Sequence, residues 1–285
     1  MGNPAEAEYR KVMEANVAVH GKIAADYNKN EPQFRPENLA RVDKILSGLI
    51  ARVGARRLLD LGCGTGFVID LVRAKLEEIH GVDVTQAMLD QVDRSGPAKI
   101  TLTRGDAATF DPGPKPFDMV TSYSVLHHLY DVEPTMRTAY KALRPGGVYY
   151  TDLEPNRAFW RELSPLSPDD PLLHPLVKAE VVKILDHQVA TEIGVDRETL
   201  DLAEYGKNIR GGFDESELRA TLGRVGFSKV EITYHWFVGQ GAIINAPGTN
   251  KATQLALAEQ MDQALHRALP LSRPLYKYLG FVATK

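Results

Sequence analysis

LLDLGCGTG, at residues 58–66, is an apolar run that leads into three glycines at alternate positions. An apolar run followed by such a loop and then by a helical stretch is typical of a strand–turn–helix unit in an α/β protein. The glycines allow a tight turn and let a ligand approach the backbone closely. Taken alone, the loop fits an ordinary glycine turn as well as it fits a binding site.

Two details of the loop narrow the class of ligand. Phe67 stands where a dinucleotide-binding loop has its third glycine, and Asp60 ends the apolar run two residues before Gly62. A carboxylate at this place repels a pyrophosphate and attracts an ammonium group. The loop therefore favours a ligand whose nearby part is cationic, and it disfavours a nicotinamide dinucleotide or a phosphate.

Further short apolar runs alternate with helical stretches after the loop. They cover residues 80–83, 100–103, 117–122 and 148–151, and two more follow at 229–236 and 276–283. This alternation predicts a doubly wound, mostly parallel sheet. Helices are predicted over residues 133–143, 215–225 and 251–269.

The remaining stretches also predict helices. They cover residues 5–27, a segment that begins at Pro36 and ends near Gly54, and residues 176–189. We therefore divide the chain into N-terminal helices (1–54), a binding core (55–156 and 214–285) and a helical insertion (157–213). Ligands of open α/β sheets bind beyond the carboxyl ends of the strands. We expect both helical segments to cover that edge as a lid that selects the substrate.

Two acidic residues end the second and third apolar runs. Asp83 stands where a carboxylate can accept both hydroxyls of a ribose, and it can also cap the helix that begins near Thr85. Asp106 can accept from an exocyclic amine such as that of adenine, or it can serve as a turn residue. The sequence thus predicts a nucleoside beside the glycine loop.

In this order the motifs resemble those of class I S-adenosylmethionine-dependent methyltransferases. The resemblance rests on Asp60–Gly66, on Asp83-Val84-Thr85 with Met88, on Gly105-Asp106-Ala107 and on Leu143–Gly147. It implies a seven-stranded sheet in the order 3-2-1-4-5-7-6 with an antiparallel last strand. It also implies that the loop holds the methionyl part of S-adenosyl-L-methionine, Asp83 the ribose and Asp106 the adenine. The cofactor-binding residues expected on this basis are Tyr27, Asp60, Gly62, Cys63, Gly64, Gly66, Asp83, Val84, Met88, Asp106, Ala107 and Ser122.

The methyl acceptor is expected near the ends of the fourth and fifth strands. His127 and His128 can take a proton from a hydroxyl acceptor, or a histidine of this segment can pack and position the cofactor. Glu154 is a further candidate base, or a carboxylate that orients an amine; alternatively it binds backbone N–H groups or Arg157. No metal is expected, since the sequence places no third ligand at suitable spacing around the histidine pair.

Several polar and aromatic residues near the predicted acceptor site are candidates for substrate contact. These are Tyr123, Asn156, Trp160, His235 and Trp236. The aromatic members can clamp a planar or apolar molecule, or they can form part of the core. The sequence does not choose between these roles.

The composition indicates the compartment and the kinds of partner to expect. The chain has 285 residues, a formal net charge of −3, and one cysteine, which cannot form an internal disulfide. No apolar run approaches the roughly 18 residues that span a bilayer. We therefore expect a soluble cytoplasmic protein without nucleic-acid or membrane partners.

The sequence as a whole predicts a methyltransferase that acts on a small molecule by in-line transfer. The alternative is a non-methylating descendant of the fold, either a cyclase or a binding module that retains the cofactor pocket. Neither the acceptor nor the oligomeric state is predicted.

Overall fold

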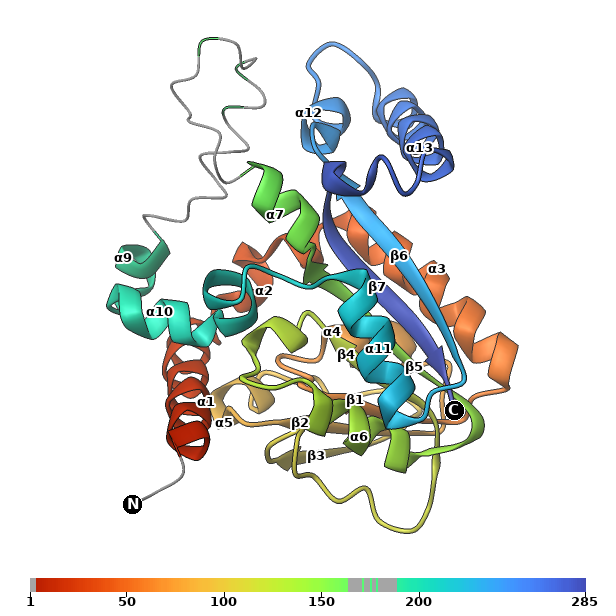
Figure 1. The fold of residues 1–285 in the computed structure, drawn as a ribbon. Coiled ribbons are helices and arrows are strands. Elements are labelled where there is room, and N and C mark those ends of the chain that lie inside the picture. Colours follow the sequence, from red (N-terminus) through yellow and green to blue (C-terminus); the bar gives the residue numbers. More distant parts are fainter. Residues whose placement is uncertain (1–3, 164–170, 172–174, 176–177, 179–188) are drawn as a thin grey trace.

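A seven-stranded sheet lies at the centre of the computed structural model, which describes residues 4–163, 171, 175, 178 and 189–285 (Figure 1). The strands run in the order β3-β2-β1-β4-β5-β7-β6. Strands β1 to β5 pair in parallel, and β7 pairs antiparallel with both β5 and β6. This confirms the predicted order and the antiparallel last strand. The bounds are β1 Arg57–Leu61, β2 Glu78–Asp83, β3 Lys99–Arg104, β4 Phe117–Tyr123, β5 Leu143–Pro155, β6 Lys229–Phe237 and β7 Tyr276–Thr284.

Helices connect the strands and extend beyond the sheet. The α-helices are α1 Pro4–Ile23, α2 Tyr27–Asn30, α3 Pro36–Val53, α4 Phe67–Val72, α5 Gln86–Leu89, α6 Glu133–Ala142, α7 Arg157–Leu163, α9 Val189–Ile193, α10 Arg197–Ala203, α11 Glu215–Val225, α12 Gln240–Ile244 and α13 Lys251–Arg267. Short turns of other helix types are η1 Pro32–Phe34, η2 Leu126–His128, η3 Tyr205–Ile209 and η4 Arg273–Leu275. None of the helices among the described residues is long and apolar enough to cross a membrane.

The sheet separates two apolar layers because successive side chains of a strand point to opposite faces. Leu58 packs in one layer with residues of α3 and α4, whereas Leu59 packs in the other with residues of α6 and α11. Tyr149 and Tyr150 divide in the same way. Each fully buried side chain of this size stabilises the fold by about 1.5–3 kcal/mol. The two layers fix the sheet and therefore the edge at which its strands end.

Two predicted elements differ from the structure by more than two residues at one end or at both. The first helix ends at Ile23 rather than at residue 27, because the Asp26 N–H bonds to the Ile23 carbonyl and a new short helix begins at Tyr27. The fifth strand runs well past residues 148–151, and its register with β7 shifts between Thr151 and Glu154. Most of the helix predicted over residues 176–189 lies outside the described residues.

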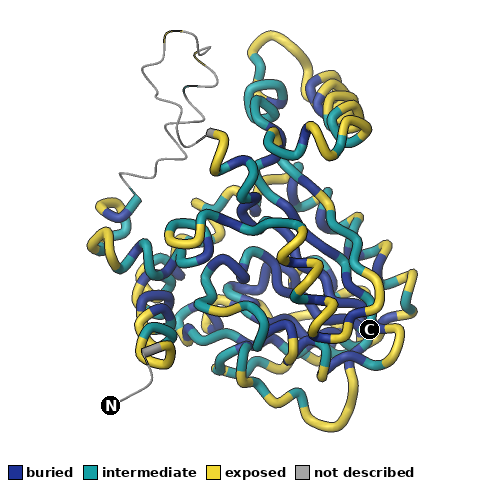
Figure 2. Tube along the Cα trace, in the orientation of Figure 1, coloured by how far each residue is buried: buried dark blue, intermediate teal, exposed yellow. Residues whose placement is uncertain are grey.

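The N-terminal helix α1 lies beside α9 and α10, although these segments are far apart in sequence (Figure 1). Ala15 and Val19 of α1 form a small apolar cluster with Ala203 of α10. Helices α12 and α13 follow β6 and precede β7 in sequence, and they project from the end of the molecule opposite α1. Helix α13 is largely exposed (Figure 2).

Candidate active site

The glycine loop after β1 adopts backbone conformations that favour glycine. Gly62, Gly64 and Gly66 have φ angles of 75°, 51° and 94°. A Cβ atom added at Gly62 would lie 2.6 Å from both methyl carbons of Val125. The loop is held against β2, because the N–H groups of Gly62 and Cys63 both donate to the Val82 carbonyl. Its shape therefore depends on the absence of side chains there.

Asp60 lies beneath this loop at the end of β1 and is almost fully buried. Its Oδ1 accepts a hydrogen bond from the Thr121 hydroxyl at 2.6 Å, but its buried Oδ2 has no partner among the described residues. Burial, with a smaller contribution from Asp83, raises the pKa of Asp60 to about 7 despite the Thr121 bond. A buried acceptor without a partner is costly, and this cost agrees with the raised pKa of Asp60.

Asp83, at the end of β2, is bonded to the loop and to the following turn. One carboxylate oxygen accepts from the Gly64 N–H at 2.9 Å and the other from the Thr85 N–H at 2.8 Å. Each oxygen keeps a further lone pair for a ribose hydroxyl. Burial raises the pKa of Asp83, while these two backbone donors lower it. The N-cap of α5 is Thr85, so the helix-capping role predicted for Asp83 is wrong, and Asp83 instead holds the turn before the helix through the Thr85 N–H.

Asp106, after β3, already has a partner from the N-terminal helix. Its Oδ1 accepts from the Ala108 N–H at 2.9 Å, and its Oδ2 accepts a hydrogen bond from the Tyr9 hydroxyl of α1. An adenine amine can bind the remaining lone pair of Oδ1, whereas binding at Oδ2 requires it to share this oxygen with Tyr9 or to displace it. Sequence reasoning did not find Tyr9.

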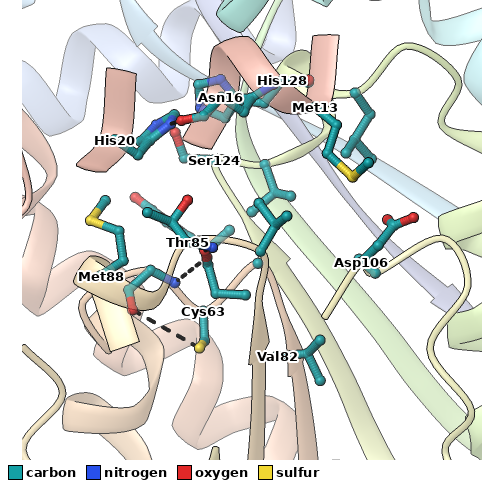
Figure 3. Close-up of a pocket in the computed structure, with 18 of the residues that line it drawn as sticks. Met13, Asn16, His20, Cys63, Val82, Thr85, Met88, Asp106, Ser124 and His128 are labelled. Atoms are coloured by element: carbon teal, nitrogen blue, oxygen red, sulfur yellow. Dashed lines mark hydrogen bonds between the residues drawn. The ribbon is translucent and has the colours of Figure 1, made fainter. Parts of the chain in front are cut away.

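A cavity beyond the carboxyl ends of β1, β2 and β4 brings most of the predicted cofactor residues together (Figure 3). Those that line it are Tyr27, Gly62, Cys63, Gly64, Asp83, Val84, Met88, Asp106 and Ala107. Asp60, Gly66 and Ser122 lie outside the lining. Gly66 caps α4, and the Ser122 hydroxyl accepts from the Tyr149 hydroxyl at 3.0 Å in the core.

One wall of the cavity comes from α1, which the sequence assigned only generally to a lid. Its contributions are Tyr9, Val12, Met13, Asn16 and His20. The Asn16 amide donates to the His128 carbonyl at 2.8 Å and so ties α1 to η2. A polar Asn16 among the buried Val12, Ala15 and Val19 is the signal that could have identified this face.

Glu154 is fully buried in β5 and faces η2 rather than the cavity. Its two oxygens accept from the N–H groups of Val125, Leu126 and His127 at 2.9–3.0 Å. Its Oε2 also accepts from the His127 Nδ1 at 2.8 Å. This geometry corresponds to the alternative in which Glu154 binds backbone N–H groups, and it makes Glu154 a positioning residue for η2.

The two histidines of η2 have different surroundings. Burial lowers the pKa of His127, but Glu154 more than compensates and raises it. Burial and the neighbouring His127 lower the pKa of His128 well below its usual value. Of the three predicted catalytic residues, only His128 lines the cavity.

Glu204 joins this pair from the segment between α10 and η3. Its Oε2 lies 3.9 Å from His127 Nε2, and its Oε1 lies 3.6 Å from His128 Nδ1. Burial raises the pKa of Glu204, but His128, Lys207 and His127 lower it to about 2. The sequence had placed no third metal-type ligand near the histidine pair. The structure brings Glu204 to the pair, because the chain returns to η2 after β5, α7, α9 and α10.

The predicted substrate residues do not converge on this cavity. Only Tyr123 lines it, stacked on Phe67 with ring centroids 4.5 Å apart. The Asn156 amide donates to the carbonyls of Arg273 and Tyr276, which gives it a structural role.

The other three predicted substrate residues lie elsewhere on the carboxyl side of the sheet. His235 Nε2 is 3.4 Å from Asp152 Oδ1, and burial lowers the pKa of His235 to about 4. Trp236 has a φ of 60°, and within the part of the chain that the structure describes the buried Nε1 of Trp160 has no hydrogen-bond partner. These three side chains remain candidates without a described cavity.

The sequence around the glycine loop is similar to that of known methyltransferases. A family model described as a methyltransferase domain matches residues 59–149. A probable S-adenosylmethionine-dependent methyltransferase from Mycolicibacterium smegmatis is 28% identical over 128 residues, which are 44% of this chain and 49% of the relative. Residues 59–149 thus match a methyltransferase domain, and the relatives of this region include S-adenosylmethionine-dependent methyltransferases. The cofactor of this family is S-adenosylmethionine.

Other relatives of the methyltransferase domain have more specific names. A ubiquinone biosynthesis O-methyltransferase from Idiomarina loihiensis is 25% identical over 171 residues, or 54% of this chain and 67% of the relative. Among solved structures, a plantazolicin methyltransferase in complex with a triazolic desmethylPZN analog and S-adenosylhomocysteine has the same fold: it superposes with a TM-score of 0.57 at 15% identity, over 99% of this chain and 98% of its own. The matches to the curated relatives thus span about half to two thirds of those relatives' length.

Proposed function

We propose that the chain transfers the methyl group of S-adenosylmethionine to a small-molecule acceptor. The observation that carries this proposal is the cavity, where the glycine loop, Asp83 and Asp106 line one continuous space that α1 covers. These groups differ in chemistry along the cavity, as a ligand with an amino acid part and a nucleoside part requires. The named relatives agree with small acceptors.

The residues present fit the parts of this cofactor. Asp83 has lone pairs left for the ribose hydroxyls, and the partnerless oxygen of Asp60 lies below the loop that would hold the methionyl part. Asp106 can accept the adenine amine at Oδ2 when the Tyr9 hydroxyl shares or leaves that oxygen. When bound, S-adenosylmethionine supplies an electrophilic methyl group on a sulfonium.

The chain's own contribution is alignment and exclusion of water. Holding reactants at attack distance is worth about 7–11 kcal/mol of barrier. Glu154 fixes η2 through three backbone N–H groups, and Asn16 fixes α1 on η2. His128 is the predicted catalytic residue placed to meet an acceptor, while Glu154 and His127 act by positioning it.

The N-terminal helices and residues 157–213 act as the proposed lid. Support comes from α1, which both lines the cavity and packs on α9 and α10. The lining contributed by described residues contains the carboxylates of Asp83 and Asp106 but no lysine or arginine. This favours a neutral or cationic acceptor over a carboxylate or a phosphate.

The direct test is to detect S-adenosylhomocysteine by mass spectrometry after incubating the purified chain with S-adenosylmethionine and panels of phenols, amines and carboxylic acids. We expect acceptor-dependent product with at least one neutral or cationic class. Tight cofactor binding without product from any panel would instead favour the non-methylating alternative. Absence of cofactor binding would contradict both.

A further inference from the structure

His127, His128 and Glu204 form an imidazole–carboxylate cluster that the sequence did not anticipate. One ligand-type atom from each of the three residues lies within 4.8 Å of the others. The cluster joins η2 to the segment that connects α10 and η3, and His127 is almost fully buried. It combines two nitrogen donors with one ionised oxygen donor, and this set suits a transition metal such as zinc.

Both imidazoles of the cluster are anchored through one nitrogen. His127 Nδ1 donates to the Glu154 carboxylate and His128 Nδ1 donates to the Ala203 carbonyl, each at 2.8 Å. A carbonyl can only accept, so the hydrogen of neutral His128 is on Nδ1. The Nε2 lone pair of each ring is thereby left for another partner. Metal-binding histidines typically donate their second nitrogen to a carboxylate or a backbone carbonyl in this way.

We propose that His127, His128 and Glu204 bind a divalent transition metal ion of the zinc class. Metal–ligand distances of about 2.0–2.2 Å place neighbouring tetrahedral ligand atoms roughly 3.4 Å apart. Glu204 Oε2 lies 3.9 Å from His127 Nε2, so a small side-chain movement reaches that spacing. Glu204 Oε1 lies 3.6 Å from His128 Nδ1, which is bonded to the Ala203 carbonyl, so the His128 ring must turn to bring a nitrogen lone pair to the same ion. Glu154 is the residue that orients His127 from outside the cluster.

The surroundings of the cluster define what the ion must displace and where it would lie. Lys207 Nζ is 3.8 Å from Glu204 Oε2 and competes for this oxygen. His128 also lines the cofactor cavity, and His20 of α1 meets its ring edge-on with centroids 4.8 Å apart. An ion in the cluster would therefore lie at the cavity wall and link η2 to the segment between α10 and η3. The inference rests on these contacts and not on methyl transfer, but an ion bound to His128 Nε2 would occupy the lone pair that a base needs, so His128 can serve as metal ligand or as base and not as both.

The test measures metal content and affinity on the full chain without a histidine tag. The protein is stripped with a chelator, incubated with zinc, desalted and analysed for zinc by mass spectrometry, and affinity is measured by competition with a chromophoric chelator. Glu204→Gln preserves the shape of the ligand and removes its charge. Glu198→Gln in α10 is the matched control, because Glu198 is exposed and outside the cluster.

We expect about one zinc per chain in the parent and in Glu198→Gln, and at least tenfold weaker binding in Glu204→Gln. His128→Ala should weaken binding similarly, and Co²⁺ bound to the parent should show visible absorption that His128→Ala loses. Circular dichroism checks that each variant is folded. Failure of the parent to retain zinc, or equal zinc affinity in the parent and Glu204→Gln, would overturn the proposal. The cluster would then be an ion-pair contact between lid and core.

Discussion

Asp60 shows how a single buried group can oppose folding and yet favour the ligand. In the native chain its pKa is about 7, whereas a carboxyl group in an unfolded chain has a value near 3.8. A raised pKa means that the native state holds the proton more tightly than the unfolded state. The contribution of Asp60 to stability is therefore complete below the unfolded pKa and is lost as pH rises through about 7.

We expect the free energy of unfolding of Asp60→Asn to exceed that of the parent at pH 8. The difference should be smaller at pH 5.5. The pKa difference corresponds to roughly 4 kcal/mol as an upper bound. The same substitution should weaken cofactor binding, because it removes the charge that attracts an ammonium group. Thermal unfolding at the two pH values, together with calorimetric titration, measures both effects. A stability gain that is independent of pH would contradict the assigned pKa.

Gly62 provides a second test at the residue scale. Its φ of 75° and the 2.6 Å approach of Val125 to an added Cβ both oppose a side chain. Gly62→Ala should lose about 1–3 kcal/mol of unfolding free energy and most cofactor binding. Gly48 is the control, because it is exposed within α3 and has no atom within 4 Å of an added Cβ. Gly48→Ala should gain about 0.5–1 kcal/mol. Equal effects of the two substitutions in thermal unfolding would disprove the argument.

At the element scale, Glu154 determines the conformation of η2. Three N–H groups of that segment and the His127 ring depend on its carboxylate. A buried donor left without a partner costs about 1–3 kcal/mol. The element that carries His128 is thus held by a residue on a different strand.

Glu154→Gln should lower the free energy of unfolding by about 2–4 kcal/mol, since the amide keeps one acceptor and loses the charge. It should lower kcat more than it weakens cofactor binding, because η2 holds His128 and not the ribose. Glu162→Gln is an exposed glutamate control from the following helix α7. Unfolding by denaturant and steady-state kinetics separate the two effects. Unchanged stability would show that the η2 hydrogen bonds do not require Glu154.

At the scale of the whole molecule, segments from distant parts of the chain meet beside the cavity. Helix α1 lines the cavity and packs on α9 and α10. Bound S-adenosylhomocysteine should slow amide hydrogen exchange in α1 and α10 and leave α13, which is outside this contact, unchanged. Mass spectrometry of exchanged peptides measures this. Equal protection of α1 and α13 would argue against a lid.

The parts of the fold that could be predicted are those encoded by residues close together in the sequence. Strand β1 and its loop are encoded by an apolar run and glycines, and the order of the motifs implied the sheet topology. Glu204 could not be assigned to the histidine pair, because only the return of the chain after β5 brings it there. Tyr9 and Asn16 were missed because α1 has an ordinary helical composition. The alternation of Leu58 and Leu59 between layers, by contrast, follows directly from strand geometry.

The central claim is that the cavity between the glycine loop and α1 binds S-adenosylmethionine. Isothermal titration of the full chain with S-adenosylhomocysteine, for the parent, Asp83→Ala and Asp90→Ala, tests it most directly. Asp90 is exposed just after α5 and serves as the control. We predict one site per chain, at least tenfold weaker binding in Asp83→Ala, and parent-like binding in Asp90→Ala. Parent-like affinity in a folded Asp83→Ala variant, or no binding to the parent at hundreds of micromolar, would contradict the account.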